Sequence, residues 1–119
     1  MKGGRRIVQR RQARRDAVEQ AVVIARDNPA AADRFLEAID ETLELLAGMP
    51  GMGAARRYRS PGLQGLRMHP VRGFPQHLLF YLPLPDGIEL VRVLHGKRNI
   101  ERLFREDPPP DASKRGGEG

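Results

Sequence analysis

The chain of 119 residues contains no cysteine and only three histidines, at positions 69, 77 and 95. Without cysteine it can form neither a disulfide framework nor a thiolate zinc site, and three histidines are a thin supply of metal ligands. We therefore expect no bound metal and no cofactor of any other kind.

Long apolar runs are also missing from the sequence. No segment approaches the roughly 20 apolar residues needed to span a bilayer. The basic N-terminus is followed by arginine-rich sequence, where a secretory signal peptide would need an apolar core. These features predict a cytoplasmic protein that has no membrane partner.

Aromatic residues make up only 5% of the chain, whereas apolar residues make up 39% and charged residues 30%. This composition is typical of a globular protein with a mainly aliphatic core, and the length suits one domain. We place that domain at residues 1–105. The remaining residues, 106–119, are rich in proline and glycine and predict a disordered tail.

The net charge of +6 is unevenly distributed. Residues 1–15 contain lysine and arginine but no acid, residues 16–50 are mainly acidic, and basic residues predominate again from Arg56 to Arg105. A cationic protein favours an anionic partner such as nucleic acid or an acidic protein surface.

Two helices are predicted in the first half of the chain. Residues 12–26 have a helical spacing of apolar residues that predicts one buried stripe, with Asp16 and Glu19 off it; the stripe residues are Val18, Ala21, Val22 and Ala25. Asn28 and Pro29 suit the start of a second helix, and Gly48 suits its end in a left-handed conformation. The short connection between them predicts an antiparallel hairpin.

The second helix is the clearest element of the sequence. Its apolar residues share one face, and its carboxylates lie elsewhere; the predicted core comprises Phe35, Ile39, Leu43 and Leu46 from this helix and Phe80, Val91 and Val93 from later strands.

Strands account for most of the rest. Residues 5–9 predict a short edge strand, residues 66–71 an edge strand weakened by Pro70, and residues 77–82 and 88–95 two stronger strands. The last two are joined around Asp86 and Gly87, which favour a tight turn. Residues 97–105 predict a short terminal helix.

This order predicts an α+β fold: an N-terminal strand, a helical hairpin packed on a mostly antiparallel sheet of three or four strands, and a short C-terminal helix. In the last strand, alternation puts Val91, Val93 and His95 on one face and Leu90, Arg92 and Leu94 on the other. Both faces are therefore apolar. Since helices cover one face only, we expect a partner chain on the other.

The ordered segments resemble toxins of the RelE/ParE superfamily of bacterial type II toxin–antitoxin modules, most closely ParE. The resemblance covers about residues 13–105 and rests on ARR at 13–15, IARDNPAAADRFLEAIDETLELLAGMPGMG, FYLPLPDGIELVRVLHG and KRNIERLF. It implies a plasmid-stabilisation toxin that inhibits DNA gyrase and forms a hetero-oligomer with a ParD-like antitoxin.

The RelE branch is the alternative, and its resemblance implies a metal-independent endoribonuclease that cuts messenger RNA on the ribosome. The residues that match its pattern are Arg67, His69, His77 and Arg98. The chain departs from the pattern at Phe104, where RelE-like toxins have a functional tyrosine, because a phenyl ring can neither donate nor accept a proton. We therefore favour gyrase inhibition over catalysis. An inactive homologue that only binds antitoxin remains a third interpretation.

Under the favoured interpretation we expect no catalytic residues. The target-binding site consists of cations on and after the last strand together with one on an earlier strand: Arg67, Arg92, His95, Lys97, Arg98 and Arg102. Cations near a helix start oppose the helix dipole, which favours an anion docking there.

Overall fold

The structure is a computed structural model that describes residues 5–56 and 63–96. The predicted helix at 97–105 and the predicted tail at 106–119 lie outside the described residues. In chain order the elements are β1 (Arg6–Gln9), α1 (Arg11–Asp27), α2 (Pro29–Gly48), a 3-10 turn η2 (Pro50–Met52), β2 (Ala54–Ala55), β3 (Arg67–Val71), β4 (Phe74–Leu84) and β5 (Gly87–His95).

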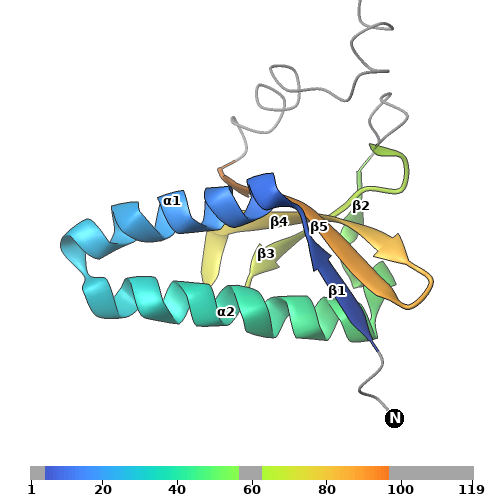
Figure 1. The fold of residues 1–119 in the computed structure, drawn as a ribbon, viewed down its shortest axis with the longest axis horizontal. Coiled ribbons are helices and arrows are strands. Elements are labelled where there is room, and N and C mark those ends of the chain that lie inside the picture. The colour runs from blue at the N-terminus through green and yellow to red at the C-terminus, as the bar shows by residue number, and fades with distance from the viewer. Residues whose placement is uncertain (1–4, 57–62, 97–119) are drawn as a thin grey trace, which may run out of the picture.

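The fold is α+β, as predicted. One five-stranded sheet has the order β1-β5-β4-β3-β2, and α1 and α2 run side by side as a hairpin over one face of it (Figure 1). β1 pairs parallel to β5, and the other neighbours are antiparallel. The sheet has one strand more than the largest number predicted, because Ala54 and Ala55 form the two-residue β2 beside β3.

The second helix begins and ends where the sequence predicts. The Asn28 side chain accepts a hydrogen bond of 3.0 Å from the backbone N–H of Ala31, and Pro29 occupies the first turn. Gly48 is the last residue, but the left-handed conformation predicted for it is wrong, because it stays within the helix and Met49 follows as the cap. The predicted core residues Phe35, Ile39, Leu43 and Leu46 are all buried. Asn28 satisfies a backbone donor that the helix itself leaves unpaired, so the start of α2 is fixed locally.

The buried face of α1 was predicted only in part: Ala21 is buried and Ala25 packs against the core, but the two valines of the predicted stripe are exposed. Val18 and Val22 are 55% and 51% exposed, while Asp16, placed off the buried stripe, is only 5% exposed. Alanines recur at positions 13, 17, 21 and 25, so two adjacent faces of this helix are similarly apolar in sequence. The face that carries Asp16 is buried because its carboxylate has partners on β5.

The alternation predicted for β5 is also wrong, because β4 and β5 change register between Phe80 and Tyr81. Phe80 pairs with Arg92 and Tyr81 with Leu90, so Val91 is an extra residue. The bulge lets Leu90 and Val93 share the core beneath the helices, although simple alternation would separate them.

The second face of the sheet is not open, contrary to the prediction. Phe80, Val91 and Leu94 are at most 3% exposed and form one cluster with Leu63 and Leu66, which precede β3. The segment before β3 therefore covers this face, and the prediction that a partner chain covers it loses its basis.

Within residues 5–56 and 63–96, neither helix is long and apolar enough to span a membrane.

Candidate target-binding site

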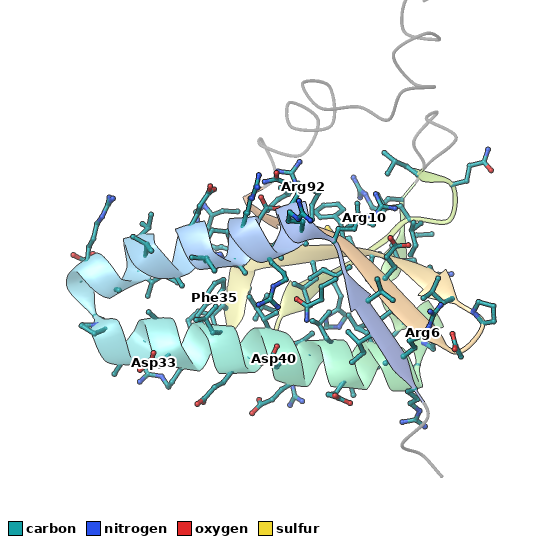
Figure 2. All side chains as sticks on the ribbon, viewed as in Figure 1. Arg6, Arg10, Asp33, Phe35, Asp40 and Arg92 are labelled. Carbon is teal, nitrogen blue, oxygen red and sulfur yellow. The ribbon has the colours of Figure 1, made fainter. Side chains whose placement is uncertain are left out.

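Arg92, one of the predicted target-binding cations, is held inside the protein. Its Nε and a terminal nitrogen donate hydrogen bonds of 2.8 and 3.1 Å to the two carboxylate oxygens of Asp16. Arg92 is 8% exposed and Asp16 5%. Figure 2 shows Arg92 beside the first turns of α1. A buried pair of this kind has little free charge to offer an external anion.

Asp16 also closes an open edge of the sheet. β1 pairs with β5 only as far as Leu90. Beyond that point the backbone N–H of Val93 donates to Asp16 at 3.0 Å, and the carbonyl of Val93 accepts from the Gln20 side chain at 2.8 Å. Two side chains of α1 thus replace the strand that β1 does not extend.

His77 is half-buried at the end of β4 nearest the helices. Its Nδ1 lies 2.7 Å from Gln20 Oε1, and because that amide oxygen can only accept, Nδ1 carries the proton. Its ring lies 4.6 Å from the rings of both Phe35 and His95, measured between centroids. Burial and then the neighbouring His95 lower the pKa of His77 from 6.5 to about 4, so its imidazole is neutral at neutral pH.

Arg67 is used to hold the turn that follows α2. Its guanidinium donates to the carbonyl oxygens of Gly53 and Gly51, at 2.5 and 3.3 Å. Opposite it in the sheet, the Tyr81 hydroxyl donates to Pro50 and accepts from the N–H of Gly53, at 2.7 and 2.8 Å. Burial raises the pKa of Tyr81, which keeps the phenol protonated for this pair of bonds.

His69 and His95 are the remaining predicted site residues within the described part of the chain. His69 Nδ1 lies 2.7 Å from the carbonyl oxygen of Pro70, to which it can donate, and His69 is partly buried. His95 is exposed at the end of β5 and pairs across the sheet with His77. Of the predicted target-binding residues within the described chain, His95 is the one whose side chain is exposed at the sheet's end.

Arg67, His69 and His77, the described residues of the alternative nuclease site, share the helix-facing side of the sheet, and His69, opposite Leu79, lies between the other two. Arg67 is opposite Tyr81, four residues along β4 from His77. At about 3.3 Å per residue and 4.8 Å between strands, the backbones of Arg67 and His77 are about 14 Å apart. The side chain of each is held at its own end of the sheet, so these two do not meet on one phosphate.

Lys97, Arg98 and Arg102 lie outside the described residues, so their predicted role is carried forward as a proposal. Sequence reasoning missed Asp16, Gln20 and Tyr81, whose hydrogen bonds hold the strands and turns around the candidate site. No local signal marks Asp16, because the partner that buries it lies 76 positions away.

Among the described residues, no group of three histidine, aspartate or glutamate side chains could hold a metal ion.

Comparisons with known proteins agree with this architecture. A model of the family described as the ParE toxin of the type II toxin–antitoxin system, parDE, matches residues 7–100. A solved structure titled as the chromosomal ParDE toxin–antitoxin system from P. aeruginosa superposes with a TM-score of 0.62 at 17% identity, covering 79% of this chain and 98% of the other. At that identity the likeness concerns the fold. A search of curated proteins gave no match.

Proposed function

Because the chain belongs to the family of ParE toxins of type II toxin–antitoxin systems, we propose that it inhibits DNA gyrase and is neutralised by a ParD-like antitoxin with which it forms a hetero-oligomer. The match over residues 7–100 is the observation that carries the proposal. Gyrase is a cytoplasmic target, so the toxin acts in the cytoplasm. The toxin's net charge of +6 favours binding to a target such as gyrase, which is itself bound to anionic DNA.

The proposed contact with gyrase begins at His95 and continues into Lys97, Arg98 and Arg102. His95 is exposed at the end of β5, and the three cations follow it in the sequence. Arg67 and Arg92 contribute indirectly under this proposal. Arg92 ties β5 to α1 and so positions the strand from which the contact extends, whereas Arg67 holds the turn after α2, beside β3.

The separation of Arg67 from His77 supports inhibition by binding over RNA cleavage. Cleavage without a metal needs a base, an acid and cations gathered on one phosphate. His77 is neutral, and its Nδ1 proton is donated to Gln20. Phe104 has no hydroxyl to take part in proton transfer.

The proposal is tested by inducing expression in bacteria and by assaying purified toxin against gyrase. We expect a DNA-damage response without early translation arrest, and dose-dependent loss of supercoiling. A variant carrying Lys97→Glu and Arg98→Glu loses inhibition by roughly tenfold or more, since each change reverses a charge at the contact. Arg56→Glu, an exposed arginine outside the proposed contact, serves as the matched control.

Translation arrest with cleavage of ribosome-bound message, and no effect on supercoiling, would instead select the endoribonuclease interpretation. A folded chain that binds antitoxin but harms neither process would select the inactive homologue.

A further inference from the structure

One glutamine on α1 joins this helix to the two central strands of the sheet. The amide nitrogen of Gln20 donates to the carbonyl oxygen of Val93 on β5 at 2.8 Å, and its amide oxygen lies 2.7 Å from Nδ1 of His77 on β4. Both contacts lie near the end of β5 from which the proposed contact with gyrase extends, since His77 pairs with His95. The proposed function assigns no role to Gln20.

The two contacts fix the direction of the Gln20 amide. The carbonyl oxygen of Val93 can only accept a hydrogen bond, so the NH₂ group of Gln20 must face β5. Its oxygen then faces His77, and Nδ1 of His77 must supply the proton. Burial and the neighbouring His95 lower the pKa of His77 to about 4, so at neutral pH its ring is neutral and Nε2 carries no proton. Gln20 therefore selects one of the two tautomers of His77.

His77 in turn supports His95, the last residue of β5. The two residues pair across the sheet, and the centroids of their rings are 4.6 Å apart. The His77 ring is also 4.6 Å from the ring of Phe35 on α2. The ring beside His95 is thus held from both helices, by a hydrogen bond from α1 and by a ring contact from α2.

The backbone that leads to the proposed contact is held from the same point. Val93 lies two residues before His95, so their side chains share one face of β5. At Gly96 the chain leaves the strand with a φ of +79°, a conformation that favours glycine, and the N–H of Gly96 donates to the carbonyl of Gln76 at 2.9 Å. The chain after residue 96 therefore starts from a fixed point, just beyond the position that Gln20 holds.

The two hydrogen bonds of Gln20 contribute little to overall stability. Its side chain is only partly buried, so water replaces much of what a lost hydrogen bond provided. In a Gln20 variant, Asp16 keeps its bond to the N–H of Val93 and its pair with Arg92, so β5 remains attached to α1. What Gln20 adds is a common orientation for the end of β5 and the His77 ring.

We propose that Gln20 is a positioning residue for the contact with gyrase. By holding the end of β5 together with one tautomer of His77, it presents His95 and the chain after Gly96 in a single arrangement before the target binds. A contact that is already ordered loses less conformational freedom on association, so it binds more tightly. This inference rests on the proposed function, because the contact that Gln20 serves is the proposed one.

The tautomer of His77 is measured on the free toxin by NMR, from the chemical shifts of isotope-labelled ring nitrogens. In the wild type we expect a proton on Nδ1 and none on Nε2. Gln20→Met has a similar length but no acceptor amide, so we expect a mixture of tautomers. Gln20→Glu still accepts from Nδ1, which stays protonated, but its carboxylate cannot donate to Val93. Gln64→Met, at an exposed glutamine before β3, is the matched control.

Inhibition of gyrase supercoiling is then compared per folded molecule, with the folded fraction taken from circular dichroism. We expect half-inhibition by either Gln20 variant to need roughly tenfold more toxin than the wild type, because the target must order the end of β5 itself. The control variant inhibits like the wild type. A role limited to stability would lower the folded fraction but leave inhibition per folded molecule unchanged.

Wild-type inhibition by folded Gln20→Met or Gln20→Glu overturns the proposal, and so does a single tautomer protonated on Nδ1 that persists in Gln20→Met. Failure of the proposed function is seen separately, in the wild type alone. A wild-type chain that leaves supercoiling unchanged overturns the proposed function and with it the role of Gln20 at gyrase, whereas equal inhibition by an active wild type and its variants overturns only the role of Gln20.

Discussion

Asp16 on α1 holds Arg92 on β5 through two hydrogen bonds, and one of its oxygens also accepts the backbone N–H of Val93. One carboxylate therefore neutralises a buried guanidinium and satisfies a strand edge. Removing either partner of a buried ion pair costs far more than the pair contributes, because the remaining charge has no counterpart.

We predict that Asp16→Ala lowers the free energy of unfolding by about 3 to 5 kcal/mol, measured by urea denaturation. Glu41→Ala, at an exposed carboxylate, changes it by less than about 0.5 kcal/mol. The double variant Asp16→Leu with Arg92→Met regains much of the loss, since no charge is left buried. Equal stability of Asp16→Ala and wild type would show that Arg92 finds another partner.

The turn after α2 leads to a prediction about two glycines two residues apart. A Cβ on Gly53 would lie 2.5 Å from the Tyr81 hydroxyl and 2.8 Å from the carbonyl of Met68, whereas one on Gly51 would meet nothing within 4 Å. Gly53 has φ −70°, a backbone conformation that alanine also adopts, so a substitution there tests only the crowding of the added Cβ. Gly53→Ala costs about 2 kcal/mol or more, and Gly51→Ala is neutral or slightly stabilising. Thermal unfolding of both variants measures the difference.

The environment of His77 predicts a pH dependence of stability. Its pKa is lowered from 6.5 to about 4 in the folded protein, so the unfolded chain binds its proton more readily. The contribution of His77 to the free energy of unfolding is fully present above about pH 6.5. It decreases as the pH falls toward about 4, and below that pH it changes no further. His77→Gln flattens the curve over that window, as read from unfolding midpoints at successive pH values. An unchanged slope would place the acid sensitivity elsewhere.

Phe104 supplies a functional prediction. If the chain acts by binding, Phe104→Tyr creates no messenger RNA cleavage, because a hydroxyl alone does not bring a base and cations together. The measurement is cleavage of ribosome-bound message by the purified variant and wild type. Cleavage gained by the variant would show that the remaining cations form a nuclease site.

The elements with local signals were predicted well. The start of α2 follows from Asn28 and Pro29, and the turn between β4 and β5 from Asp86 and Gly87, because capping and turn geometry depend on adjacent residues. β4 extends further than predicted, from Phe74 to Leu84. It includes Pro75 and Pro83, which lie near the two ends of the strand.

The errors concern long-range contacts. Alternation along β5 cannot anticipate a bulge set by its pairing with β4. The buried side of α1 depends on Asp16 meeting Arg92, which the spacing of apolar residues within α1 does not contain. The cover on the second sheet face likewise depends on Leu63, which precedes the predicted strands, and on Leu66, which was placed at the start of an edge strand. The internal partners of Arg67 and Arg92 were not predictable for the same reason, because they lie on segments far away in the sequence.

The short β1 strand has a further consequence. It leaves the part of β5 beyond Leu90 without a strand on the side opposite β4, where Asp16 and Gln20 bond the backbone groups of Val93. An uncovered strand edge is a template on which other chains can add strands. These two side chains thus protect the toxin from aggregation, and losing them would first be seen as insolubility during expression.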